Sequence, residues 1–131
     1  MMKSIPVWKQ ELSDGVHAAR LASLYCCAPA ETASEAARYA AVLDGLEKTF
    51  GSHAEAGLYS APGRTEIGGN HTDHQHGRVL AGSVNIDMIA AAAPNDKNQL
   101  RVQSEGYDLC VIDLNDLEAR KEEENTTAAL L

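Results

Sequence analysis

The sequence contains little positive charge, few cysteines and no long apolar run. Its 131 residues include 11 Lys and Arg against 19 Asp and Glu, which gives a net charge of -8. This balance argues against a nucleic-acid partner, because nucleic-acid phosphates favour lysine and arginine. No apolar stretch is long enough to span a bilayer and no secretory signal is recognised, so we expect no membrane partner. The three cysteines, Cys26, Cys27 and Cys110, indicate reduced thiols in a cytoplasmic protein.

Residues 1–54 are predicted to form an N-terminal helical arm. After a short helical or extended start, apolar residues recur at helical spacing over residues 15–27. The clearest helix follows, with a predicted capping box at Thr32–Glu35 and a glycine, Gly51, placed to end it in a left-handed turn. Its apolar face consists of Ala36, Tyr39, Ala40, Leu43, Leu46 and Phe50. Such spacing is typical of a stripe that faces a core.

Residues 55–131 are predicted to form a β domain, which makes the whole chain α+β. Short strands are expected at 58–61, 84–88, 100–103 and 109–112. In the second strand Val84, Ile86 and Met88 alternate with polar residues, which predicts that these three face the interior. Short connections between the last three strands favour an antiparallel meander. Residues 115–124 are mostly charged and are expected to be a linker or a weak helix.

The loop predicted at residues 60–80 is rich in glycine and histidine. Glycine lets the main chain approach a ligand closely, because no Cβ intervenes. Within this loop, the run G-R-T-E-I-G-G-N-H-T-D-H resembles the galactokinase signature G-R-x-N-L-I-G-E-H-x-D-Y of the GHMP kinase superfamily. The matching positions are Gly63, Arg64, Ile67 (Leu in the pattern), Gly69, His71, Thr72 and Asp73. The resemblance implies the N-terminal segment of a divergent, bacterial-type galactokinase-like protein.

The resemblance also implies a fold and an activity. The helices would precede a mostly antiparallel or mixed sheet, part of the GHMP kinase N-terminal domain (ribosomal protein S5 domain 2-like), here incomplete. The whole protein would use ATP and Mg²⁺ to phosphorylate the anomeric hydroxyl of galactose or a related hexose. The segment alone is expected to be inactive and without cofactor, because it has neither a Walker A loop nor the superfamily's G-L-S-S-S-A phosphate loop and catalytic aspartate. The short apolar turn at residues 128–131 also suggests truncation, since so short a helix is unstable in water.

Four loop residues receive roles from the resemblance. Arg64 matches the arginine beside the sugar hydroxyl that attacks ATP, and its paired donors suit the stabilisation of charge during transfer. His71 and Asp73 match galactose-contacting residues, and their directional hydrogen bonds suit sugar hydroxyls. Asn70 is expected to contact the sugar as well, but the family has Glu at this position. The amide has lost a charge and gained two donors, so selectivity among hexoses is expected to be altered.

Three other interpretations stay open. Some members of the galactokinase family bind ligand and signal without catalysis, so the parent could be a sugar sensor. The run His71, Asp73, His74 and His76 resembles a zinc cluster, but no distant fourth ligand is suggested, and we assign no metal. An incomplete sheet would expose an edge and apolar surface, which also makes self-association an expectation.

Overall fold

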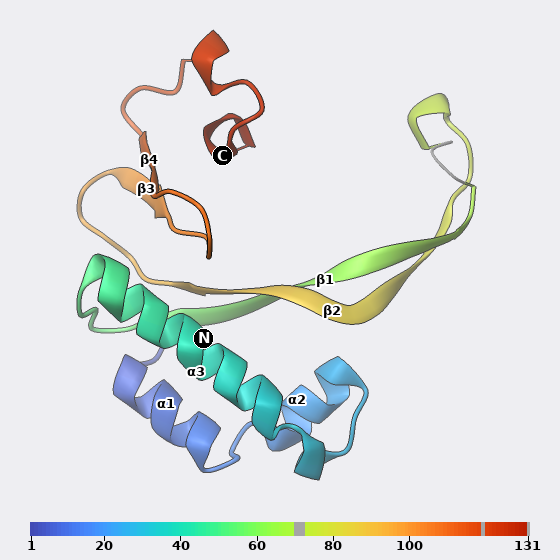
Figure 1. Ribbon diagram of the computed structural model, residues 1–131, viewed down its shortest axis with the longest axis vertical. Helices are drawn as coiled ribbons and strands as arrows, with labels where there is room; N and C mark the ends of the chain where they lie inside the picture. Colours follow the sequence, from blue (N-terminus) through green and yellow to red (C-terminus); the bar gives the residue numbers. More distant parts are fainter. Residues whose placement is uncertain (70–72, 119, 131) are drawn as a thin grey trace. The chain divides into compact units, whose positions relative to one another are not determined.

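The computed structural model describes residues 1–69, 73–118 and 120–130, with Asp73 described by its main chain. Two compact units divide the chain, Met1–Ala93 and Pro94–Leu131. Helices occupy the start of the first unit, and antiparallel strands follow (Figure 1). The predicted α+β class, with N-terminal helices before antiparallel strands, is confirmed. The predicted boundary between residues 54 and 55 lies between the end of the last α-helix and the start of the first strand. That it separates two domains stays a prediction.

Three α-helices form the helical part of the first unit. They are α1 (Ile5–Ser13), α2 (Ala18–Tyr25) and α3 (Ala33–Phe50), with the short 3-10 helix η1 (Pro29–Glu31) between the last two. The second helix is shorter than the predicted span of residues 15–27. It ends where Cys26 adopts a left-handed conformation, φ +52°, and donates its N–H to the carbonyl of Ala22. Gly51 ends α3 with a φ of +85° and donates to the carbonyl of Glu47. The helix thus ends at this glycine with a positive φ, but its ψ of -175° is extended, so the predicted left-handed turn is wrong.

The predicted capping box at the start of α3 is wrong. Thr32 precedes the helix, but its hydroxyl donates to the carbonyl of Pro29 at 2.8 Å and makes no bond to the first turn. The 3-10 turn directly before the helix determines this, since it brings the Pro29 carbonyl within reach of the side chain. A threonine hydroxyl bonded backwards in this way closes a local turn instead of capping the helix.

The core of the first unit lies where α1, α2 and α3 meet. Its buried members are Ile5, Leu12, Leu21, Tyr25, Tyr39, Leu43, Leu46 and Ala56. The predicted face of α3 is confirmed, because three of its members are buried and the others pack against them. Trp8 also packs against this core, and its indole N–H donates to the carbonyl of Ala56 at 2.8 Å. This contact ties α1 to the segment that leads into the first strand.

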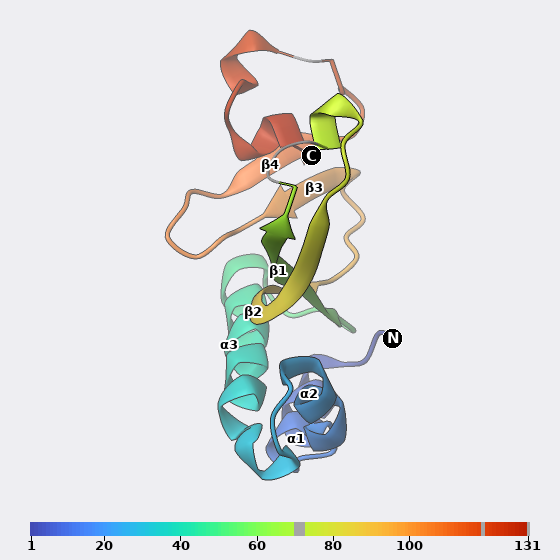
Figure 2. The same cartoon turned by 90° about the vertical axis from the view of Figure 1, so that its right-hand side faces the viewer.

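A long antiparallel hairpin, β1 (Gly57–Gly68) paired with β2 (Leu80–Ala92), completes the first unit. The helices cover the half of the hairpin that begins at Gly57, and the other half extends beyond them (Figures 1 and 2). The short strand predicted at 58–61 therefore continues to Gly68. The first nine residues of the loop predicted at 60–80 are strand, which shortens that loop to residues 69–79.

The predicted inward face of β2 is also wrong in its second half. Ile86 and Met88 are exposed, while Asp87, Ile89 and Ala91 are half-buried. The pairing shifts register at this point: Pro62 pairs with Asp87, and Arg64 pairs with Ser83. A register shift of this kind is a β-bulge, and it interrupts the regular alternation that the prediction assumed.

The second unit contains a small hairpin, β3 (Gln99–Val102) paired antiparallel with β4 (Cys110–Asp113). In the predicted three-stranded meander β2 would pair with the strand after it. Within the described residues β2 pairs with β1, and β3 with β4, in two separate two-stranded sheets, so that meander is wrong. Two 3-10 turns follow, η3 (Lys121–Glu123) and η4 (Thr127–Leu130).

Candidate functional site

The residues singled out from the sequence lie along the far half of the β1–β2 hairpin. At its tip the loop begins with Gly69, whose φ is +95°. A Cβ on Gly69 would lie 2.3 Å from the carbonyl oxygen of Arg78 and 2.8 Å from the Cα of Val79. The two ends of the loop therefore approach so closely that only glycine fits. The short 3-10 turn η2 (Asp73–Gln75) follows within the loop.

Arg64 lies in β1, in the first pair after the register shift. Its side chain is exposed. Between the Pro62 and Arg64 pairs, β1 contributes Gly63 alone and β2 contributes residues 84–86. A Cβ on Gly63 would lie 3.1 Å from Val84 Cγ2 and 3.2 Å from the carbonyl oxygen of Ile86, so the bulge packs tightly over this glycine. Bulges of this kind occur beside active sites, where they redirect a side chain.

The other predicted site residues are only partly described. Asn70 and His71 lie outside the described residues, and Asp73 begins the turn η2. Their convergence with Arg64 on one ligand therefore stays a prediction. The structure does establish the support on which they are carried, which is a loop closed by Gly69 at the end of two paired strands.

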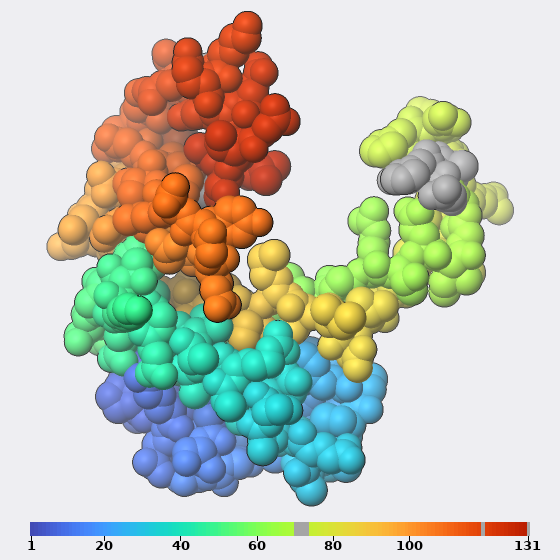
Figure 3. All heavy atoms as spheres, viewed as in Figure 1, coloured from blue at the N-terminus to red at the C-terminus, as the bar shows by residue number. Residues whose placement is uncertain are grey.

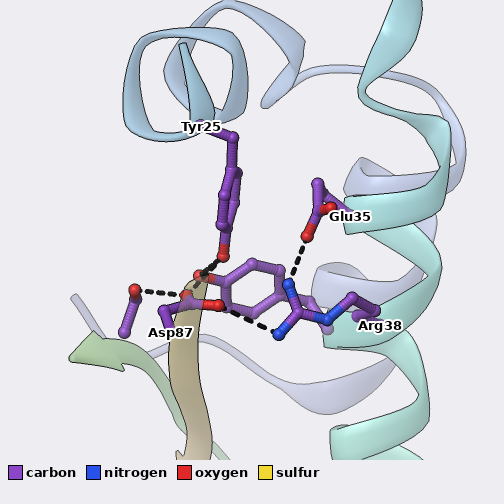
Figure 4. A network of polar contacts seen from close by, with 6 residues as sticks. Tyr25, Glu35, Arg38 and Asp87 are labelled. Atoms are coloured by element: carbon purple, nitrogen blue, oxygen red, sulfur yellow. Dashed lines mark hydrogen bonds and ion pairs between the residues drawn. The ribbon is translucent and has the colours of Figure 1, made fainter. Parts of the chain in front are cut away.

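A buried polar network at the other half of the hairpin was missed by sequence reasoning (Figure 4). Its centre is the carboxylate of Asp87, whose side chain is only 2% exposed. One oxygen, Oδ2, accepts hydrogen bonds from Tyr25 and Ser60, both at 2.5 Å, and the other accepts from Arg38 at 2.9 Å. The hydroxyls of Tyr25 and Tyr39 lie 3.1 Å apart. The network therefore joins α2, α3, β1 and β2 at one carboxylate.

The electrostatics of this network keep the carboxylate charged. Burial would raise the pKa of Asp87, but the hydrogen bonds from Ser60, Tyr25 and Arg38 outweigh burial and lower it below its usual range. Burial, followed by the bond to Asp87, raises the pKa of Tyr25, so the phenol stays protonated as a donor. Arg38 also forms an ion pair with Glu35 at 2.5 Å, and the bonds to Glu35 and Asp87 raise its pKa. Alternation of apolar residues gave no signal for this network. The one available signal was an aspartate, the only charged residue in this strand.

The metal interpretation finds no support in the described side chains. Among them, no group of three or more His, Cys, Asp or Glu residues lies close enough to hold an ion. His71 and the side chain of Asp73 fall outside that description.

Comparison with known proteins places a family signature on this hairpin. A family model for the galactokinase galactose-binding signature matches residues 46–94, which run from the last turn of α3 through β1, the loop and β2. This chain carries the galactose-binding signature of the galactokinases. The predicted resemblance to an N-terminal galactokinase segment is thereby confirmed, and Arg64 and the loop lie within the matched residues.

Curated galactokinases match the chain over part of its length. The chain is 35% identical over 83 residues to the galactokinase of Ligilactobacillus salivarius, a match that covers 61% of this chain and 21% of the relative. It is 33% identical over 66 residues to that of Lacticaseibacillus casei, covering 50% and 17%, and 34% identical over 71 residues to that of Streptococcus suis, covering 52% and 18%. The matched segment thus spans about a fifth of these galactokinases. No solved structure matches the chain. Among the described residues, no helix has the length and hydrophobicity that a membrane span requires.

Proposed function

We propose that this chain is the sugar-binding part of a galactokinase-like sugar 1-kinase. The whole kinase transfers the γ-phosphoryl group of ATP to the anomeric hydroxyl of galactose or a related hexose. One observation carries the proposal: the galactose-binding signature at residues 46–94 includes the whole β1–β2 hairpin and its glycine-closed loop. The proposal includes a cytoplasmic location, which agrees with the free thiols of Cys26, Cys27 and Cys110.

Arg64 is the residue that assists transfer in this proposal. A guanidinium stays charged at every physiological pH and offers paired donors in a fixed plane. Phosphoryl transfer depends chiefly on positioning and charge stabilisation, so a cation beside the attacking hydroxyl lowers the barrier. Two features support the assignment: the Arg64 side chain is exposed, and it lies on a paired strand next to a bulge. A paired strand holds a charged group more precisely than a loop does.

The loop residues Asn70, His71 and Asp73 hold the sugar hydroxyls in this proposal. Each offers directional hydrogen bonds, and together they provide both donors and acceptors. Asn70 replaces the family's glutamate and so presents an amide N–H₂ where a charged acceptor is usual. A site built for one hydrogen-bond pattern discriminates strongly against a sugar with another pattern. We therefore propose a hexose preference that differs from that of the glutamate-bearing relatives.

ATP and Mg²⁺ are the proposed cofactors of the whole kinase. When bound, they supply the phosphoryl group and neutralise its charge during transfer. The sequence of this chain contains no phosphate loop of the superfamily type. We therefore expect the isolated chain to hold neither cofactor and to turn over no ATP.

The test is ATP consumption by the whole protein against a panel of hexoses. Galactose or a close relative is expected to be phosphorylated, and Arg64→Ala is expected to lower kcat by about 100-fold or more, the usual effect of removing one electrostatic stabiliser. Arg20→Ala is the matched control, because it removes the same charge from an exposed position on α2. Unchanged turnover in Arg64→Ala would remove this residue from the mechanism. Sugar binding without any ATP consumption by the wild type would replace the kinase with a sensor.

A further inference from the structure

We infer that Asp87 is a positioning residue for Arg64. By anchoring β2 to the helices, its carboxylate fixes the bulge that precedes Arg64 and so sets where the guanidinium lies. The inference rests on the proposed function, because a position matters only if Arg64 takes part in transfer. Asp87 itself is not proposed to touch sugar or ATP.

The first observation is the place of Asp87 in the hairpin. Asp87 forms the last regular pair before the register shift, with Pro62, and Arg64 forms the first pair after it, with Ser83. Two of the three β2 residues between these pairs, Val84 and Ile86, pack over Gly63, with contacts to a Cβ there of 3.1 and 3.2 Å. The bulge is therefore held at one end by Asp87 and carries Arg64 at the other.

The second observation is how completely Asp87 is held. Three donors from three elements converge on it: Tyr25 from α2, Arg38 from α3 and Ser60 from β1. A carboxylate that is 2% exposed is tolerated only when its oxygens are hydrogen-bonded. A slip of β2 by one residue would replace it with Ile86 or Met88 and leave all three donors without their acceptor. The network therefore selects one register.

The third observation is that the far half of the hairpin has little other support. Figure 3 shows that half extending away from the helices, and its strand residues are mostly exposed. Among the described residues of the first unit no helix packs on it, so its orientation depends on the anchored half and on the bulge. At about 3.3 Å of rise per residue, Arg64 lies only about 7 Å along the strand from Pro62, the pairing partner of Asp87. A change in the geometry of the bulge would therefore displace Arg64 by nearly the same distance.

The energetic consequence follows from how catalytic groups act. A misplacement of about 1 Å by a change remote from the reacting atoms can cost roughly 100-fold in rate. Loss of the Asp87 anchor is thus expected to lower kcat and to leave KM nearly unchanged, since Arg64 acts in the transition state. A purely structural role would instead lower the amount of folded protein and leave kcat per folded molecule unaltered.

The decisive experiment compares Asp87→Asn with Leu46→Ala. Leu46 is buried in α3 and is not one of the three donors to Asp87, so its substitution destabilises the same unit without touching the carboxylate. In the chain itself, NMR cross-strand contacts report the Pro62–Asp87 and Arg64–Ser83 pairs with no sugar or ATP present. The Arg64–Ser83 contact is expected to weaken or move in Asp87→Asn and to persist in Leu46→Ala. An unchanged Arg64–Ser83 contact in folded Asp87→Asn would overturn the inference.

Two further arms keep the test decisive. Should Asp87→Asn fail to fold, Ser60→Ala removes only the donor from β1, and a displaced Arg64–Ser83 contact is again expected; an unchanged contact would count against the anchor. In the whole kinase, Asp87→Asn is expected to lower kcat by about 10- to 100-fold with KM within about threefold, whereas Leu46→Ala is expected to keep kcat per folded molecule. If the wild-type protein phosphorylates no hexose, the proposed function fails, while the NMR comparison still decides whether Asp87 sets the register.

Discussion

Gly69 and Arg78 face each other across the neck of the hairpin loop, where a Cβ on Gly69 would lie 2.3 Å from the Arg78 carbonyl oxygen. The φ of Gly69 is also +95°, a conformation that residues with side chains rarely adopt. Two independent constraints therefore require glycine at the one motif position that closes the loop. The glycine before it has neither constraint: a Cβ on Gly68 would meet nothing within 4 Å.

We therefore predict that Gly69→Ala opens the neck of the loop and that Gly68→Ala does not. The backbone strain alone costs about 1–2 kcal/mol, and the clash with Arg78 adds to it. Hydrogen exchange measured at the amides around Arg78 and Val79 is expected to accelerate in Gly69→Ala and to stay near the wild-type rate in Gly68→Ala. Equal protection in both variants would show that the close approach does not hold the loop.

The charge of Asp87 predicts a fall in stability at acid pH. Its pKa is lowered in the folded state, so its contribution to the free energy of unfolding is present above the unfolded-state pKa and is lost as the pH falls through the folded-state value. Urea unfolding of the wild type is therefore expected to show stability that is flat near neutrality and declines at acid pH. Asp87→Asn is expected to be less stable than the wild type at pH 7. Its free energy of unfolding is also expected to fall less than that of the wild type as the pH becomes acid. A parallel decline in both proteins would assign the acid sensitivity to other carboxylates.

The parts of the fold that sequence predicted are those governed by local pattern. The stripe on α3 and the glycine that ends the helix are local, because apolar spacing and a positive φ act within a few residues. The loop glycines were also recognisable, since Gly69 is part of the signature. The alternation in β3 likewise predicted its strand.

The features that sequence missed depend on contacts between distant residues. Asp87 faces inward because Tyr25, Arg38 and Ser60 satisfy it, and these partners lie 27 to 62 positions away in the chain. Apolar alternation assigned the inward face to Ile86 and Met88 because it contains no information about the bulge or about partners so distant in the chain. The capping box failed for a more local reason, the preceding 3-10 turn that draws the Thr32 hydroxyl backwards.

Trp8 is expected to serve packing and to have no part in sugar binding, and this can be tested. Its ring lies 5.3 Å from that of His17 and under the Lys3 ammonium, and its N–H is bonded to the buried Ala56. We predict that Trp8→Phe lowers the free energy of unfolding by about 1 kcal/mol, the usual net worth of one hydrogen bond, together with a packing loss. The apparent affinity of the whole kinase for sugar is expected to stay unchanged. Val7→Ala, an exposed neighbour on α1, is the control and is expected to have little effect on either quantity. A weaker sugar affinity in Trp8→Phe would contradict the assignment of Trp8 to packing.

The outer face of the β1–β2 hairpin predicts self-association of the isolated chain. Tyr59 and Met88 belong to alternate cross-strand pairs, Tyr59 with Ala90 and Met88 with Ala61, and are 56% and 78% exposed. Apolar side chains on a two-stranded sheet with open edges favour association with a second copy. Sedimentation velocity is expected to show a concentration-dependent increase in mass for the wild type and a smaller one for Met88→Lys, which adds a charge to this face. Leu24→Lys, on an exposed position of α2, adds the same charge away from the hairpin and is expected to associate like the wild type. An equal reduction by both substitutions would attribute association to net charge and not to this face.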